Sequence, residues 1–214
     1  ATSHKYTAKH SSSKNHSKSY THHKTTYNKP KVDTRPELTL KDVQVPNKLW
    51  GIDISHYQAD INWLALADER PNFMFIKASE GINLKDEKYA SYYDEASKLG
   101  IPVGSYHFFS YKSSGKEQAE NFLSVAKHKN GDLLPVLDAE YTKSMPEDKS
   151  KIKAELIDFV TTIYQKLGSY PIIYCNHRYF QTYLAETILQ ANCKLWIVDY
   201  KNEPICNWTL WLST

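Results

Sequence analysis

From Trp50 onward, short apolar runs alternate with longer segments whose apolar residues recur at helical spacing. The clearest helical pattern covers Lys151 to Leu167 and ends at Gly168, a residue that favours helix termination. Two shorter helices are expected from Glu87 to Leu99 and from Lys116 to His128. The apolar runs predict strands at Trp50 to Ser55, Phe73 to Ala78, Val103 to Phe109, Leu133 to Glu140, Ile172 to Asn176, Leu195 to Tyr200 and Thr209 to Ser213. Strands that alternate with helices of this length form βαβ units, so the pattern predicts an α/β fold with a parallel sheet.

Residues 1–46 lack this pattern. They consist mainly of Lys, Ser, Thr, His, Tyr and Asn, with almost no aliphatic residue before Val32. Because such a segment cannot bury enough apolar surface to offset chain entropy, we expect residues 1–46 to be a disordered tail or linker. The folded domain is then expected to cover residues 47–214.

The net charge of +3 averages two different regions. The first 32 residues hold seven of the 27 Lys and Arg and none of the 24 Asp and Glu, so this tail carries +7 and the rest of the chain −4. The tail is expected to act as a soluble tether, or to contact an anionic cell-wall polymer or membrane surface. No nucleic-acid partner is expected, because a role resting on the tail alone would leave the acids of the body unexplained.

Acidic residues recur where the predicted strands end. A parallel sheet can be open or closed, and the chain has neither a G-x-G-x-x-G nor a Walker A sequence to indicate a nucleotide-binding fold. The acids at the strand ends are Asp53, Glu80, Asp138, Glu140 and Asp199. In a β/α barrel these ends form the rim on which active sites are built, so the acids would converge on one pocket. Such a pocket, with aromatic walls, suits a polyhydroxylated substrate whose bond is broken by proton transfer.

The sharpest single feature is the pair Asp138 and Glu140 at the end of a buried apolar run. Period-two alternation puts both carboxyl groups on the same face, with Cα atoms roughly 6.6 Å apart. If they point inward, mutual repulsion and partial burial raise the pKa of one of them. A carboxyl group that keeps its proton near neutral pH can act as a general acid. Two solvated acids at a strand end are the alternative interpretation.

A series of short motifs along the body resembles a known family. They are Gly51 to Ser55 with Tyr57 and Gln58, Ile61 to Trp63, Phe75 to Gly81, Gly104 to Phe108, Gln118 and Ala119 with Phe122, Leu134 to Glu140, Pro171 to Tyr174, Leu195 to Ile197 with Tyr200, and Trp208 with Leu210 and Trp211. Each motif is weak, but their order and spacing together are similar to those of the glycoside hydrolase family 25 muramidases, lysozymes of bacteria, phages and some fungi.

The resemblance implies an irregular TIM-like barrel of five β/α units followed by three strands, (β/α)5β3. It also implies cleavage of the β-1,4 bond between N-acetylmuramic acid and N-acetylglucosamine in peptidoglycan. Glu140 would be the general acid, and Asp138 would orient the 2-acetamido group, whose carbonyl oxygen attacks the anomeric carbon. Asp53 would stabilise the developing positive charge or help to position that group. An inverting scheme with Asp53 or Asp138 as the base for a water stays open, because backbone spacing does not fix the side-chain tips.

Further residues are expected to bind the glycan. Glu80 could hydrogen-bond sugar hydroxyls or instead hold Lys77 in an ion pair. Only one of Tyr106 and His107 can face the barrel interior, and His107 is expected in the core. Aromatic side chains that could stack on sugar rings, or merely fill the barrel, are Tyr57, Tyr106, Tyr174, Trp196, Tyr200 and Trp211.

The chain departs from the family at its end. It has Leu212 where the family usually has Gln, and Asp199 where a basic residue or His is frequent. The family also continues to a last strand that bears another Asp, so we expect either that the barrel lacks this strand and exposes a sheet edge, or that the register at its end differs. Two other functions are considered: a catalytically silent glycan-binding barrel, and another retaining N-acetylhexosaminidase of the chitinase type. The silent barrel would be expected to lose Glu140 or Asp138, and the chitinase type needs an additional Asp before Asp138.

The remaining features complete the expectations. The three cysteines, Cys175, Cys193 and Cys206, are too few for a disulfide framework, and buried free thiols are favoured over a bridge between Cys193 and Cys206. No cofactor or metal is expected. The protein is expected to be a monomer that is secreted or associated with the cell envelope, although residues 1–30 are not a signal peptide.

Overall fold

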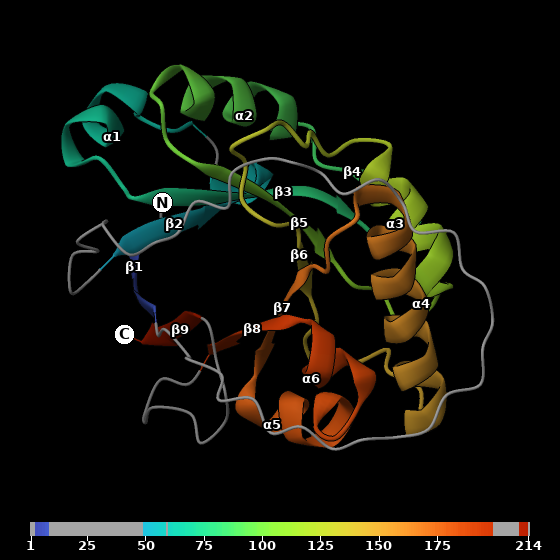
Figure 1. The fold of residues 1–214 in the computed structure, drawn as a ribbon. Coiled ribbons are helices and arrows are strands. Elements are labelled where there is room, and N and C mark those ends of the chain that lie inside the picture. The colour runs from blue at the N-terminus through green and yellow to red at the C-terminus, as the bar shows by residue number, and fades with distance from the viewer. Residues whose placement is uncertain (1–2, 9–48, 59, 199–209, 214) are drawn as a thin grey trace, which may run out of the picture.

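The computed structural model describes residues 3–8, 49–58, 60–198 and 210–213. It shows an α/β fold in which helices cover the outer side of a curled, mostly parallel sheet (Figure 1). The strands are β1 (Ser3–Ala8), β2 (Trp50–Ile54), β3 (Phe73–Glu80), β4 (Leu84–Lys85), β5 (Val103–Phe108), β6 (Val136–Asp138), β7 (Ile172–Asn176), β8 (Lys194–Val198) and β9 (Leu210–Ser213). The helices are η1 (His56–Gln58), α1 (Trp63–Glu69), α2 (Tyr89–Lys98), α3 (Gly115–Leu123), α4 (Lys149–Leu167), α5 (His177–Tyr179), η2 (Phe180–Leu184) and α6 (Ile188–Asn192).

The sheet follows the order β2-β1-β9-β8-β7-β6-β5-β3-β4, and β2 also pairs with β3. Strands β2, β3, β5, β6 and β7 are each followed by a helical segment, and β8 and β9 continue the parallel array. The short strand β4 pairs only with β3, in the antiparallel sense. This arrangement agrees with the predicted α/β class and parallel sheet.

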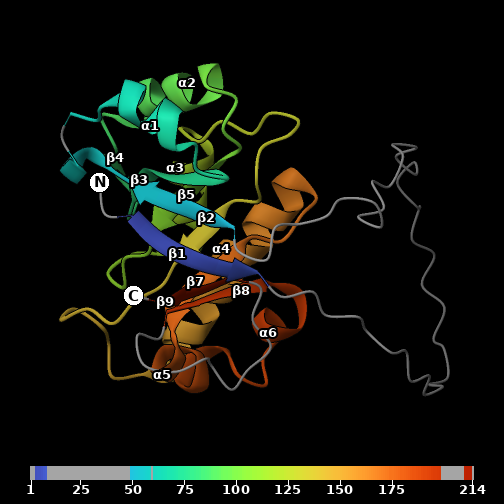
Figure 2. The ribbon, with the colours of Figure 1, turned by 90° about the vertical axis from the view of Figure 1, so that its left-hand side faces the viewer.

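Strand β1 differs from the expectation for the tail. It pairs antiparallel with β2 on one side and with β9 on the other, and it therefore joins the two ends of the curled sheet (Figure 2). Within residues 3–8 the prediction of a disordered tail is wrong, because backbone pairing on two sides satisfies a segment that has little apolar surface of its own. The edge that we expected to be exposed is covered by this strand. The rest of residues 1–46 lies outside the described residues.

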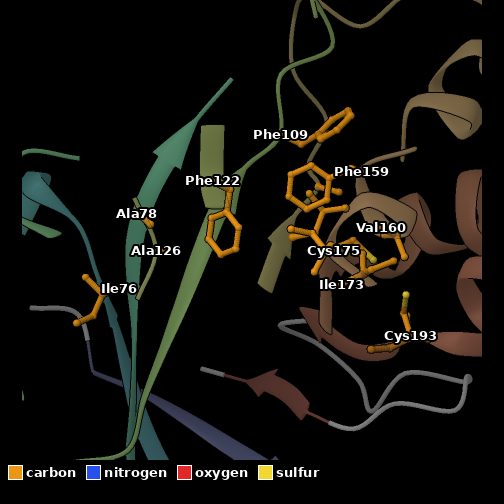
Figure 3. Close-up of a cluster of buried hydrophobic side chains, with 14 of the residues drawn as sticks. Ile76, Ala78, Phe109, Phe122, Ala126, Phe159, Val160, Ile173, Cys175 and Cys193 are labelled. Carbon is orange, nitrogen blue, oxygen red and sulfur yellow. The ribbon is translucent and has the colours of Figure 1, made fainter. Parts of the chain in front are cut away.

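The two faces of the sheet bury different side chains. Phe73, Phe75, Val136, Ile172 and Trp196 pack together on the inner face. The alternate residues of the same strands pack outward against the helices, and Figure 3 shows this layer between β3, α3, α4 and β7. The alternation tells us which way the polar side chains at the strand ends point.

Small residues allow the inner aromatic rings to fit. A Cβ atom on Gly51 would collide with the ring of Phe73, and one on Gly104 would collide with the ring of Phe75. Both glycines lie on strands that flank β3, so each removes a side chain where a ring from the neighbouring strand crosses the interior. The rings of Phe73 and Phe75 can therefore fill the space on the inner face of the sheet.

The predicted helices and strands are present, but helix α3 ends at Leu123 instead of His128, and two further kinds of difference occur. Strand β6 is shorter than the predicted strand from Leu133 to Glu140, because Pro135 cannot donate to the ladder. Helix α1 and the short helices after β7 were not predicted, since they are too short for a clear apolar period. Helix α4 begins at Lys149, where Asp148 accepts hydrogen bonds from the amides of Ser150 and Lys151.

Two of the three cysteines lie in the described part of the chain. Cys175 and Cys193 are both buried, and burial raises the pKa of the Cys193 thiol to about 12. Cys206 lies outside the described residues. None of the described helices is both long and apolar enough to cross a bilayer.

Candidate active site

The inner face of the sheet brings the predicted acids together. Ile52 and Ile54 pack outward, so Asp53 between them points into the barrel. Leu137 and Ala139 are likewise fully buried in the outer layer. The ladder continues past β6, because the Ala139 amide donates to the Tyr174 carbonyl at 2.9 Å. Asp138 and Glu140 consequently face the interior together, as the alternation predicted.

Asp138 lies in the most desolvated position of the three. Its Oδ1 atom is fully buried and has no hydrogen-bond partner among the described residues. Burial raises its pKa well above the usual carboxyl range, and the charges of Glu140 and Asp53 raise this pKa further. The ammonium group of Lys77 acts in the opposite direction. A buried carboxyl oxygen without a fixed donor is suited to accept a hydrogen bond from a ligand.

Glu140 combines partial burial with a fixed backbone. Burial is the largest cause that raises its pKa, and the charge of Asp53 adds to it. A hydrogen bond from the Tyr174 side chain partly offsets these effects. The Tyr111 hydroxyl donates to the Glu140 carbonyl oxygen at 2.8 Å and lies 2.7 Å from the Tyr179 hydroxyl. Sequence reasoning missed this tyrosine pair, because neither residue lies near Glu140 along the chain.

Glu80 makes an ion pair instead of standing alone. Its carboxylate lies 2.6 Å from the Lys77 ammonium group, which is 6% exposed. The same ammonium lies 5.1 Å from the ring centroid of Phe108 and 5.8 Å from that of Tyr57. Of the two roles considered for Glu80, the structure shows the contact with Lys77. The positive charge of Lys77 lies close enough to lower the pKa of Asp138, whereas the negative charge of Glu80 raises it.

The predicted aromatic residues occupy different depths. Tyr106 and Tyr174 pack at the inner face and are half-buried. Burial raises the pKa of the Tyr106 phenol, nearby Asp138 and Asp53 raise it further, and a hydrogen bond with Ser55 lowers it. Trp196 is only 4% exposed, with its ring 4.8 Å from Phe75 between centroids. Trp196 therefore forms part of the buried floor of the candidate site, beside Phe75.

The other predicted residues lie at the margin or outside. Tyr57 follows β2 and is 77% exposed. Trp211 belongs to β9, where its backbone is paired with β8 and β1, and nothing more of it is described. Tyr200 lies outside the described residues, as does Asp199.

His107 lies in the core, as expected. Its Nδ1 is 2.9 Å from the Ser79 hydroxyl and its Nε2 is 3.2 Å from Oε1 of Gln118. Burial lowers the pKa of the imidazole to about 4. A neutral ring in this position links β3, β5 and α3, and it faces away from the acids.

The described residues also form a pocket outside the barrel. It has a volume of about 140 Å³ and lies between the loop after β5 and the first turns of α4. None of the predicted site residues lines it. Within the described ranges, no group of three or more His, Cys, Asp or Glu is arranged to hold a metal ion.

Known sequences match most of the chain. The sequence profile of "Glycosyl hydrolases family 25" matches residues 52–212. Lysozyme M1 of Streptomyces globisporus is 41% identical over 98 residues, which cover 44% of this chain and 33% of that protein. The uncharacterized protein YegX of Escherichia coli is 31% identical over 140 residues, 63% of this chain and 51% of that protein. The chain thus spans about half the length of YegX and less of the lysozyme.

The fold is also similar to solved structures. A family 25 glycosyl hydrolase from Bacillus anthracis superposes with a TM-score of 0.70 at 31% identity, covering 77% of this chain and 78% of that chain. The match of the family profile extends over most of the chain and includes Asp53, Asp138 and Glu140. The chain belongs to glycosyl hydrolase family 25.

Proposed function

We propose that this chain is a muramidase, which hydrolyses the β-1,4 bond between N-acetylmuramic acid and N-acetylglucosamine in peptidoglycan. The observation that carries the proposal is the convergence of Asp53, Asp138 and Glu140 on the inner face, with the pKa of both Asp138 and Glu140 raised. A raised pKa keeps Glu140 protonated, so that it can donate this proton to the leaving glycosidic oxygen. Family membership and the similarity to a lysozyme support the same reaction.

The chemistry that fits this arrangement uses the substrate's own acetamido group. Glu140 protonates the glycosidic oxygen while the acetamido carbonyl oxygen attacks the anomeric carbon, so that the C–O bond to the leaving sugar breaks. Asp138 accepts the acetamido N–H and orients it; the positive charge that develops on this group favours ionised Asp138 despite burial. Asp53 adds negative charge to the same region. The Glu140 carboxylate then takes a proton from the water that opens the cyclic intermediate, with net retention.

The aromatic residues supply the walls and floor of this site. Tyr106 and Tyr174 are proposed to contact the sugar bound next to the acids, and Trp196 to support Tyr174, since their ring centroids are 4.9 Å apart. Glu80 is proposed to hold Lys77 beside the acids, and Tyr200 and Trp211 are proposed to contact the glycan. The protein is proposed to act as a monomer on cell walls outside the cytoplasm.

Product analysis tests the proposal. Purified peptidoglycan is incubated with the protein, the products are reduced, and the new reducing ends are identified by mass spectrometry. Muramic acid ends are expected, and a parallel digestion of chitin oligosaccharides distinguishes a chitinase-type activity. Glucosamine ends, or binding to peptidoglycan without any release, would contradict the proposal; the second result would favour a silent glycan-binding barrel. The anomeric configuration of the first product, followed by NMR, separates retention from inversion.

A further inference from the structure

Asp86 is a buried carboxylate that the proposed reaction does not use. It follows β4, and its side chain is completely buried. Its backbone is fixed by a hydrogen bond from its amide to the Ala78 carbonyl at 2.9 Å. Its Oδ1 accepts the Lys88 amide at 3.0 Å. A carboxylate held so firmly in the interior is costly unless it stabilises a neighbouring group.

The neighbouring group is His56, at the end of β2. Oδ2 of Asp86 accepts the His56 amide at 3.1 Å and lies 2.7 Å from Nδ1 of the ring. Because a carboxylate only accepts hydrogen bonds, the Nδ1 atom carries the proton, and both the position and the tautomer of the ring are fixed. The imidazole is 27% exposed, so it lies at the boundary between the core and the solvent.

The imidazole supports the exposed ring of Tyr57. The centroids of the two rings are 3.9 Å apart at an interplanar angle of 39°. The turn that carries both residues is closed by the Ser55 amide, which donates to the Gln58 side chain at 2.6 Å. Tyr57 is 77% exposed, but His56 contacts one face of its ring and restricts its motion. The side chain therefore loses little conformational freedom when a ligand covers the other face. Tyr57 lies in η1, four positions after Asp53, directly beyond the end of β2 that carries this acid.

We propose that Asp86, His56 and Tyr57 form a sugar-binding shelf at the mouth of the barrel. The outer side of Tyr57 stacks on a pyranose ring of the glycan strand, since the C–H groups of a sugar are attracted to the electron-rich face of an aromatic ring. Asp86 is a positioning residue, which acts on the sugar only through His56 and Tyr57. This inference rests on the proposed function, because that function makes the ligand a glycan.

A double-mutant cycle tests the shelf in the active protein. Tyr57→Ala and Asp86→Asn are each expected to raise KM for peptidoglycan about fivefold to tenfold and to leave kcat within about twofold. The double variant is expected to be no worse than Tyr57→Ala alone, because Asp86 acts through Tyr57. Tyr57→Trp is expected to retain the low KM. If Asp86→Asn does not fold, His56→Ala replaces it in the cycle.

Asp132→Asn is the matched control. This carboxylate also accepts two hydrogen bonds, from the Tyr93 hydroxyl at 2.6 Å and the Lys129 amide at 2.8 Å, but it precedes β6 and so lies at the other end of the strands. Its loss is expected to lower the melting temperature without changing KM. An unchanged KM in Tyr57→Ala, or additive effects in the cycle, would overturn the shelf while the wild-type protein still releases muramic acid ends. A wild-type protein without that activity would instead contradict the proposed function.

Discussion

Carboxyl groups inside the barrel and on its outer surface respond to their surroundings in opposite ways. The pKa of Asp138 is raised, because the residue is buried beside two other acids. The pKa of Asp94 is lowered, because its exposed carboxylate accepts a hydrogen bond from Lys127 at 2.6 Å. The pKa of Asp148 is lowered by hydrogen bonds with Ser150 and Lys151 at the start of α4. Solvent exposure and neighbouring charges or donors, and not residue type, therefore decide which acids keep a proton that they can transfer.

Removing the inner proton donor is expected to have the largest effect. Glu140→Gln should lower kcat for peptidoglycan by about three orders of magnitude or more, because the leaving oxygen then departs without a proton. The loss should be much smaller for an aryl glycoside whose leaving group needs no protonation. Initial rates on both substrates check this expectation.

The outer surface offers the control for this variant. Glu95 is exposed and forms a surface ion pair with Lys98 at 2.6 Å, so Glu95→Gln should leave both rates unchanged. An equal loss on the two substrates would show that Glu140 does not act as the acid.

Replacement of Asp138 separates activity from stability. Asp138→Asn should lower kcat about a hundredfold or more, because the acetamido group is no longer oriented by a charge. The same change should leave the free energy of unfolding near neutral pH unchanged or raise it, because it removes a buried ionisable group next to Glu140 and Asp53. Urea unfolding and kinetics on the same preparation check both. A large loss of stability would contradict the burial of an ionisable group at this position.

The pH dependence of stability sharpens the contrast. The folded pKa of Asp138 lies above its unfolded value, so the native state binds more protons between the two values and the free energy of unfolding falls as the pH rises through that window. Asp138→Asn should weaken this fall. Asp94→Asn acts on a group whose folded pKa is lowered; its contribution is present above the unfolded pKa and is lost as the pH falls through the folded value. The differences from the wild type should therefore appear on opposite sides of the unfolded carboxyl pKa: Asp138→Asn should weaken a fall of stability above it, and Asp94→Asn should weaken a rise of stability below it, both measured by urea unfolding as a function of pH.

Sequence periodicity predicted this inner cluster well because alternation along a strand is local. That Asp138 and Glu140 share one face followed from period-two alternation, and that only one of Tyr106 and His107 faces inward followed from the same argument; which face is buried became clear only from the burial of Leu137 and Ala139. The contacts that fix the cluster were not predictable, since Tyr111 and Tyr179 are brought to Glu140 by the tertiary fold.

The same limit applies to the segments far from the acids in sequence. Asp86 lies in a loop with no motif, and its contact with His56 joins residues 30 positions apart. The pairing of β1 was missed because Ser3–Ala8 has little apolar alternation, and its position depends on backbone groups of β2 and β9. Local patterns identify strands and their faces; pairing across the sheet needs the other strands to be in place.

Tyr111→Phe is expected to have an intermediate effect on the inner cluster. The change removes a hydroxyl that contacts the Glu140 carbonyl and the Tyr179 hydroxyl, so it should cost about 1–3 kcal/mol of stability. It should lower kcat about tenfold with little change in KM, because Glu140 loses its fixed position. Tyr93→Phe, which removes a hydroxyl bound to Asp132, should cost similar stability and leave kcat unchanged. Equal kcat values in the two variants would show that Tyr111 only stabilises the fold.

The smallest expected effect concerns the lysines of the basic tail. We propose that the basic tail draws the protein to anionic cell-wall polymer, and the variant that tests this changes five lysines to Ser: Lys14, Lys18, Lys24, Lys29 and Lys31. Its rate on intact cell walls should fall about twofold to fivefold at low salt and equal that of the wild type at high salt, because salt of about 0.1 M screens charges beyond about 10 Å. Its rate on soluble glycan fragments should not change.

A matched variant distinguishes the tail from total charge. It changes five exposed lysines of the folded part to Ser: Lys116, Lys129, Lys143, Lys149 and Lys166. If net charge alone attracts the protein to the wall, both variants lose the same fraction of the low-salt rate; if the tail is the contact, only the first does. If the tail variant and the wild type have the same rate at every salt concentration, the tail acts only as a tether, because a tether needs no charge. Reactions inside the barrel should be insensitive to salt in all three proteins, since Asp138 and its neighbours interact at distances and burial that salt hardly screens.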